Sequence, residues 1–468
     1  MTSDPGRAEG GTPSGDVPLE DATLRARERR RILRRWLTPG IGIKRWLVVA
    51  LVGQVLIALA VALILRPLLV PTRPEDGSVD LLSLLSLQFL PPEIRALLMF
   101  VVGVLLFGYG AWRVLRALVE PYRSHEEPLV DLLYQRRARA RGPRIVAIGG
   151  GTGLSVLLRG LKEVTSNITA VVTVADDGGS SGKLRTQMGV PPMGDIRMCI
   201  AALADAEPAM SRLLQYRFPA GNGHDPHFAG HAFGNLLIAA MTDVNGDFEE
   251  GVRQSNRVLA VRGSVVPVAG QPITLHARMK DGTTLDGEST IERSRGVERI
   301  WITPDDISPS AEALSAITSA DVVVIGPGSL YTSLLPPLLV PGMREALASS
   351  HAARVFVCNV ATQLGETEGY SVADHLAALA EHGLSGMIDA VVVNNNLHAR
   401  QLPDDPAAPV VIDVNIRRTG LPRILALDVV DEENAHKHDP HKLAAAILEL
   451  HDDRTFARHD GALVEVPV

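Results

Sequence analysis

Two glycine-rich turns hold the residues of this chain that are best suited to bind a phosphate. The first turn follows the β-branched run Arg144–Ile148 and precedes Leu154–Lys162, whose apolar residues recur at helical spacing. A strand, a glycine turn and a helix in this order present backbone N–H groups to a phosphate at a helix N-terminus. Position 154 is Leu, so the glycines do not form a GxGxxG fingerprint. The predicted binding residues of this turn are Gly149, Gly150, Gly151, Thr152 and Gly153.

An acidic pair follows the second predicted strand, Ala170–Ala175, and opens a Gly/Ser loop. Asp176 and Asp177 stand about where a Rossmann-like unit places the carboxylate that accepts a hydrogen bond from a ribose hydroxyl. The same carboxylates could instead hold Mg²⁺ against a diphosphate. The sequence therefore predicts a ligand-facing loop with Asp176, Asp177, Ser180 and Ser181, and Mg²⁺ is the one candidate cofactor.

Asp195 and Arg197 lie at the start of a predicted helix that reaches Leu203. Asp195 is placed to cap that helix. Arg197 is less expected in a first turn, because a cation there opposes the helix dipole. A bound anion would resolve the conflict, so both residues are predicted to contact the ligand.

A glycine-rich loop with His224, His227 and His231 leads into a predicted helix that begins at Asn235. No cysteine lies nearby, and the histidine spacing fits no closed zinc site. We therefore expect His231 and Asn235 to be polar contacts to a ligand.

The second glycine turn repeats the logic of the first, with the apolar strand Asp321–Ile325 in front of it. Two such turns at the ends of strands in one sheet would face the two sides of one crevice. An ordinary strand-to-helix turn would explain the glycines but not the hydroxyl groups that follow them. The predicted contacts are Gly326, Gly328, Ser329, Tyr331 and Thr332.

The remaining pattern predicts an α/β fold, a Rossmann-like parallel sheet with a small β insertion. Polar loops follow the predicted strands Val355–Val360 and Ala390–Val393, which places the site at the C-terminal edge of the sheet. Alternation over Val265–Ile291, with turns at 280–282 and 286–287, predicts the insertion. The histidines at 436, 438 and 441 are interpreted as solvated.

Two apolar segments precede this domain. Trp46–Leu65 contains no charge and can cross a hydrocarbon core of about 30 Å as a helix, and Ala96–Trp112 is a second, shorter segment. Arginines flank the pair and are scarce between its members, so both termini are predicted to be cytoplasmic. The alternative is a pair of buried helices in a soluble protein. The predicted organisation is a disordered basic segment (1–35), a transmembrane hairpin (36–120), a linker (121–143), a nucleotide-binding domain (144–455) and a tail (456–468).

The composition narrows the function classes. A net charge of −7 argues against a nucleic-acid binder, which usually has a basic face. Cys199 and Cys358 both lie in apolar runs, which favours buried, reduced thiols in a cytosolic domain.

Five motifs occur in order along the chain: Gly149–Leu154, Val174–Gly182, Gly194–Arg197, His231–Asn235 and Gly326–Ser333. Together they resemble the gluconeogenesis factor family, the YvcK branch of the CofD-like superfamily. The resemblance implies a Rossmann-like site for a UDP-sugar such as UDP-N-acetylglucosamine, and a role in cell shape and cell-wall regulation during gluconeogenic growth. The CofD branch is a magnesium-dependent 2-phospho-L-lactate transferase. The N-terminal hairpin is an addition to the simplest family members.

Two functions follow from these observations. One is a nucleotide-sugar binder at the cytoplasmic membrane that reports to cell-envelope synthesis proteins. The other is an enzyme that transfers a phosphate-linked group with Mg²⁺. We favour the binder, because the sequence shows no Ser-His-Asp arrangement and only 4% aromatic residues to stack on a flavin-like substrate. Membrane lipid, a nucleotide sugar and further copies of the chain (a homo-oligomer) are the other expected partners.

Overall fold

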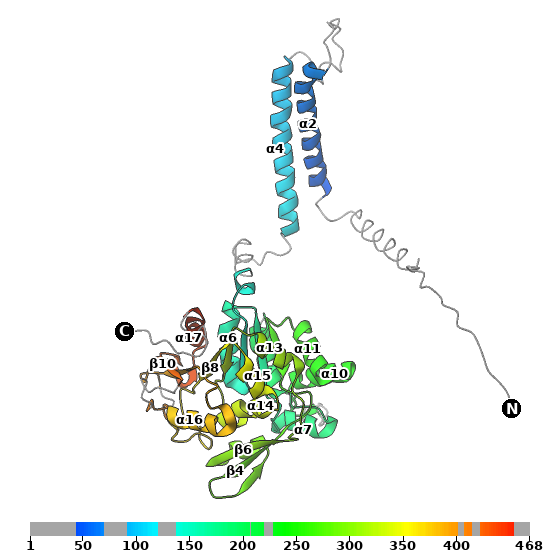
Figure 1. Ribbon diagram of the computed structural model, residues 1–468. Coiled ribbons are helices and arrows are strands. Elements are labelled where there is room, and N and C mark those ends of the chain that lie inside the picture. Colours follow the sequence, from blue (N-terminus) through cyan, green and yellow to red (C-terminus); the bar gives the residue numbers. More distant parts are fainter. Residues whose placement is uncertain are drawn as a thin grey trace, which may run out of the picture. The chain divides into compact units, whose positions relative to one another are not determined.

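The computed structural model divides the chain into two compact units, Met1–Leu132 and Leu133–Val468 (Figure 1). The predicted disordered segment, the tail, His224 and His227 lie outside the described residues, as do most of the linker and of the loop between the two apolar segments. The structure describes residues 44–69, 91–119, 137–205, 207–219, 228–400, 407–413 and 422–453.

The first unit is a pair of long apolar helices, α2 (Lys44–Leu69) and α4 (Pro92–Val119). Their most apolar parts, Arg45–Leu65 and Glu93–Ala117, have mean hydropathies of 2.9 and 2.0 and are long enough to cross a membrane. The two helices contact each other along glycines: a Cβ on Gly103 would lie 2.8 Å from the Ile57 side chain. Both predicted apolar segments are therefore helical and are candidate spans.

The second unit is built on a seven-stranded sheet in which every pairing is parallel. The strand order β10-β9-β8-β7-β1-β2-β3 runs one way from β1 to β3 and then crosses to β7 on the other side of β1. This reversal makes the gap between β1 and β7 the topological switch point, where α/β sheets bind ligands. The strands are β1 (Ile145–Gly149), β2 (Ile168–Val172), β3 (Ser264–Pro267), β7 (Val322–Ile325), β8 (Ala353–Val357), β9 (Ala390–Asn394) and β10 (Arg423–Leu427).

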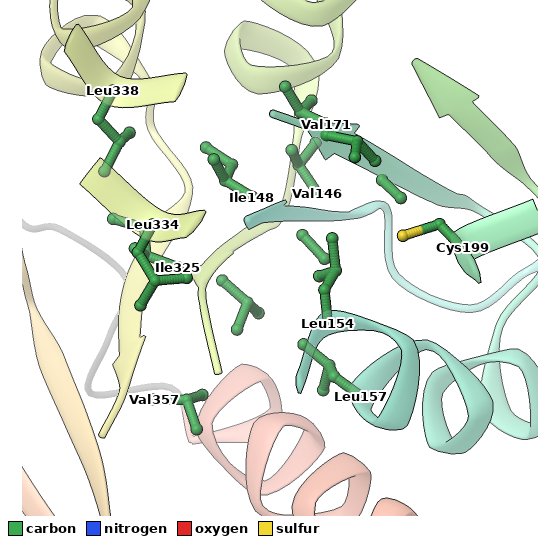
Figure 2. Close-up of a cluster of buried hydrophobic side chains, with 14 of the residues drawn as sticks. Val146, Ile148, Leu154, Leu157, Val171, Cys199, Ile325, Leu334, Leu338 and Val357 are labelled. Carbon is green, nitrogen blue, oxygen red and sulfur yellow. The ribbon is translucent and has the colours of Figure 1, made fainter. Parts of the chain in front are cut away.

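Helices cover the sheet and bury β1 on both faces, as a parallel sheet requires. Figure 2 shows Leu154 and Leu157 of one helix, and Leu334 and Leu338 of another segment, packed around Ile148 and its neighbours. The helices are α6 (Gly151–Val164), α7 (Gly179–Met188), α8 (Gly194–Leu203), α9 (Glu207–Gln215), α10 (Phe233–Asn245), α11 (Phe248–Val258), α13 (Ala311–Ser319), the π-helix η3 (Leu330–Leu334), α14 (Leu335–Leu339), α15 (Met343–Ser349), α16 (Val372–Leu379), the π-helix η4 (Ala380–Leu384) and α17 (Pro440–Asp452).

The β insertion is displaced from its predicted position. Val265–Pro267 belongs to β3 of the main sheet, and the insertion starts after it and ends at Thr303. Its three strands are antiparallel in the order β5-β4-β6, and a short helix connects β5 to β6. A two-stranded ribbon, β11 (Val430–Asp431) and β12 (Asn434–His438), precedes α17. The insertion consists of β4 (Thr274–Met279), β5 (Thr284–Asp286), α12 (Glu288–Glu292) and β6 (Val297–Thr303).

Cys199 and Cys358 are free and buried, as predicted. The described end of the predicted linker, residues 137–143, lies within the second unit, where Asn167 donates hydrogen bonds to the carbonyls of Ala140 and Gly142.

Candidate functional site

The two glycine turns lie in direct contact at the switch point. They follow β1 and β7, which are neighbours in the sheet. A Cβ on Gly153 would lie 2.5 Å from the Pro327 carbonyl oxygen and 2.9 Å from the Gly328 nitrogen. Gly151 and Gly326 have φ angles of +63° and +90°, which side chains rarely adopt. The structure thus places the two predicted turns against each other at the C-terminal ends of β1 and β7.

A groove of about 390 Å³ opens beside these turns. Asn359, in the loop after β8, fixes its rim, since it accepts from the Gly328 N–H at 3.2 Å and donates to the Gly328 carbonyl at 2.9 Å. The Gly328 N–H is therefore already engaged and is not a free donor. The groove is lined by both apolar and polar residues: Thr152, Gly153, Val156, Pro327, Asn359, Val360, Ala361, Thr362, Gln363, Leu364, Ala407, His436, Lys437 and His438.

His438 corrects the interpretation of the C-terminal histidines as solvated. Its side chain is buried, and its Nε2 lies 3.3 Å from the Cys358 carbonyl oxygen. Burial lowers the pKa of His438 to about 4, so the ring is neutral at neutral pH. His436 and Lys437 line the groove with it, whereas His441 is exposed. Only the docking of β12 against the main sheet shows this role, and no local signal in the sequence indicates it.

The acidic pair makes contacts within the protein. The Gly178 N–H donates to Asp176 at 2.8 Å, and the Ser289 N–H donates to Asp177 at 2.9 Å. Asp177 therefore ties the β insertion to the loop after β2. Burial raises the pKa of Asp176. β2 ends at Val172, so the pair stands further from the strand than the sequence pattern indicates.

Asp195 is not the helix cap that the sequence predicts. The helix α8 begins at Gly194, so Asp195 lies inside its first turn, and Met193 occupies the N-cap position without a side-chain cap. Asp195 instead accepts a hydrogen bond from the Gly151 backbone, in the first glycine turn. Burial and the nearby Asp176 charge raise the pKa of Asp195 to about 7.

Glu288 is an acidic residue of the site that the sequence analysis missed. Burial and the charges of Asp176 and Glu292 raise its pKa to about 9. It lies on α12, so only the folding of the insertion over the β2 loop brings it there. Oxygen donors of this kind suit Mg²⁺, which is commonly held by one or two carboxylates and by ligand phosphates. Within the residues that the structure describes, no three His, Cys, Asp or Glu side chains form a metal-binding group, so the phosphates would have to complete the coordination.

Four predicted polar residues form a second, buried cluster between α7 and α10. Asn235 donates to Ser180 at 3.2 Å and to Ser181 at 3.4 Å, and His231 Nδ1 lies 3.2 Å from Ser180 Oγ. All four side chains are buried. They therefore hold the two helix starts together in this conformation.

Tyr331 and Thr332 are buried and do not line the groove. The Tyr331 N–H and the Thr332 hydroxyl both donate to the buried carboxylate of Glu366, and the Tyr331 hydroxyl pairs with Tyr370. Burial raises the pKa of Glu366 to about 7. Packing thus explains the hydroxyl groups of Tyr331 and Thr332, whereas Ser329 and Ser333 are partly exposed and have no such contact among the described residues.

Similarity to known proteins agrees with this geometry. Residues 145–429 match the family described as 2-phospho-L-lactate transferase CofD. A gluconeogenesis factor from Bacillus subtilis is 46% identical over 66% of this chain and 98% of its own length. A homologue from Nostoc sp. that is named after the same factor is 44% identical over 88% of this chain and 91% of its own length. The chain belongs to the gluconeogenesis factor family of CofD-like proteins.

Within this family, a solved structure shares the fold of the second unit. A UPF0052 family member from Bacillus halodurans matches with a TM-score of 0.61 and 44% identity, over 66% of this chain and 99% of that chain. The Nostoc relative matches more of the chain than the second unit contains, so that similarity extends into the first unit.

Proposed function

We propose that this member of the gluconeogenesis factor family is a membrane-tethered regulator that binds a nucleotide sugar such as UDP-N-acetylglucosamine. The observation that carries the proposal is the groove beside the contact of the β1 and β7 turns, because α/β sheets bind nucleotides at such switch points. We expect ligand binding to regulate cell shape and cell-wall synthesis during gluconeogenic growth, through interaction with envelope-synthesis proteins. We also propose that the chain forms a homo-oligomer.

The lining of the groove supports a ligand with apolar, polar and charged parts. Val156, Val360 and Leu364 offer apolar surface to a base, and Gln363 and Thr362 offer hydrogen bonds to a sugar. Lys437 adds a positive charge, which a diphosphate requires. The volume of the groove, about 390 Å³, lies within the range of small-molecule sites.

The membrane tether rests on α2 and α4. Their length and hydropathy suit two membrane spans, and the arginines that flank them favour cytoplasmic termini. In this arrangement the second unit faces the cytoplasm, where nucleotide sugars are made available to envelope synthesis.

A second candidate function is the transfer of a phosphate-linked group with Mg²⁺. It is favoured by the description of the matched family as a 2-phospho-L-lactate transferase, and by the carboxylates of Asp176, Asp195 and Glu288 near the first turn. The nucleotide would then be a substrate and not a signal.

Calorimetry on the full chain in detergent tests the proposal, with UDP-N-acetylglucosamine, UDP and N-acetylglucosamine, each with Mg²⁺ or with chelator. We expect the nucleotide sugar to bind and to be recovered intact. Lys437→Gln should weaken binding by about tenfold or more, since a charge-assisted contact is lost. Lys280→Gln, on the insertion, is the matched control and should bind as the unaltered protein does.

Two results would contradict the proposal that this protein is a nucleotide-sugar-binding regulator. No binding of any uridine nucleotide would remove the proposed ligand class. Conversion of the nucleotide sugar when an acceptor is added, dependent on Mg²⁺, would establish the transferase.

A further inference from the structure

A second pocket, of about 280 Å³, shares Thr152 with the groove as a lining residue. Three arginines from three separate elements converge on it: Arg159 from α6, Arg197 from α8, and Arg217 from the segment after α9. The other lining residues are Thr152, Ser155, Met198 and Gln215. We call this set the arginine pocket.

Arg197 is the unusual member of the arginine pocket. The residue is only 8% exposed, yet among the described residues it has no ion pair and no side-chain hydrogen bond, and its Nε is buried without a partner. A buried cation without a partner is costly, so such groups are normally paired. The fold makes room for it at Gly234, where a Cβ would lie 2.8 Å from both Cγ and Cδ of Arg197.

The charges around Arg197 leave the arginine pocket positive. Burial and the Arg217 guanidinium lower the pKa of Arg197, while Asp195 and Asp176 act in the opposite direction. Arg159 and Lys162 both pair with Glu207, so a single carboxylate is shared by two cations. Arg217 donates to the Gly230 carbonyl at 2.9 Å but has no ion pair within the described chain. Two guanidinium groups, those of Arg197 and Arg217, therefore line the pocket without a direct ion-pair partner among the described residues.

We propose that the arginine pocket binds a phosphate group, either inorganic phosphate or the phosphoryl end of a compact phosphorylated metabolite. Two guanidinium forks match the charge of a phosphate dianion and its oxygen geometry better than they match a halide. The volume is small for a nucleotide and sufficient for a phosphate with a few carbon atoms. The site is separate from the nucleotide-sugar groove and stands whether or not that groove binds its proposed ligand. Thr152 lines both sites and connects them.

Thermal unfolding and calorimetry on the full chain in detergent test this inference. The probes are inorganic phosphate and glycerol 2-phosphate, with sodium chloride at equal ionic strength as the control. Saturable binding and a raised melting temperature are expected with one or both probes. Tighter binding of glycerol 2-phosphate identifies a metabolite site, and equal or weaker binding identifies a site for the free ion. No saturable binding of either probe up to about 10 mM would overturn the proposal.

Three variants connect binding to the arginines. Arg217→Gln alters an exposed side chain, and Arg197→Lys keeps the charge but removes the fork; each should weaken phosphate binding by about tenfold or more. Arg212→Gln, on α9 and outside the pocket, is the matched control and should change nothing. If Arg197→Lys fails to fold, Arg217→Gln still decides the question. Phosphate affinity that is unchanged in Arg217→Gln would refute the site, and nucleotide-sugar binding that persists in that variant would show the two sites to be separate.

Discussion

Gly153 and Pro327 touch across the switch point of the sheet, the first in the turn after β1 and the second in the turn after β7. No side chain fits between them, because a Cβ at position 153 would lie 2.5 Å from the Pro327 carbonyl oxygen. The two turns therefore depend on each other for their shape.

Gly153→Ala should destabilise the second unit and weaken ligand binding, although alanine favours helices. The expected loss is about 1–3 kcal/mol of unfolding free energy, the usual cost of overpacking. Gly270→Ala is the control, because the nearest atoms to its Cβ belong to the flexible Glu249 side chain. Denaturant unfolding measures this loss, and Gly153→Ala with unchanged stability would contradict the close contact.

Gly151→Val and Gly328→Val should abolish nucleotide binding, which calorimetry measures.

Asp176→Asn and Asp177→Asn distinguish a ribose contact from a metal contact. A lost charge-assisted hydrogen bond to ribose is worth roughly 1.5–3 kcal/mol, so affinity should fall by about ten- to a hundredfold with or without Mg²⁺. If the pair holds Mg²⁺, the loss should appear only when the metal is present. Calorimetry with Mg²⁺ and with chelator separates the cases. Unchanged affinity in both variants under both conditions would leave the loop with the structural contacts to Gly178 and Ser289 alone.

Glu288→Gln should stabilise the protein at about pH 8, and the gain should shrink toward about pH 5. With a folded pKa of about 9, Glu288 keeps a proton that the unfolded chain releases above about pH 4.3. The free energy of unfolding therefore falls as the pH rises from about 4 to about 9, and glutamine removes this loss. The melting temperature should rise by about 2 °C or more at pH 8. Glu298→Gln, in a half-exposed ion pair, is the control. A gain of equal size at both pH values would contradict the assignment.

Asp389→Asn should strongly destabilise the second unit. Asp389 receives hydrogen bonds from the Arg354 backbone and from two nitrogens of its guanidinium, and the Arg354 side chain is only 3% exposed. Removing one partner of a buried pair leaves the other charge uncompensated, at about 3–5 kcal/mol. The exposed Arg278–Glu298 pair offers the comparison, and breaking it should change stability by about 1 kcal/mol or less. If breaking either pair lowered the free energy of unfolding in urea by the same amount, burial would not be what makes the Arg354–Asp389 pair more stabilising.

Gly53→Val should separate α2 from α4, because a Cβ there would approach the Gly103 carbonyl oxygen to 2.7 Å. Gly108→Val has no neighbour within 4 Å and should leave the hairpin intact. Protease protection of the first unit in detergent compares the two variants.

A reporter fused after Val468 tests the predicted orientation in cells. If the reporter is accessible from outside intact cells, the prediction of cytoplasmic termini is wrong.

Local sequence determined the elements and most of their order. The β-branched run before Gly149, the helical spacing after it and the repeat of this pattern at Gly326 act within a few residues, so they predict β1, α6 and β7 without reference to the rest of the chain. The apolar segments that became α2 and α4 are equally local, since a continuous apolar helix is visible in composition alone.

Tertiary structure decided what those elements bring together. Glu288 reaches Asp176 only when the insertion folds over the loop after β2, and His438 reaches the groove only when β12 docks on the sheet. Tyr331 and Thr332 turn inward because Glu366 comes from a distant loop to accept their hydrogen bonds. Such contacts depend on strand order and on the burial of long-range neighbours, which periodicity within one segment does not encode.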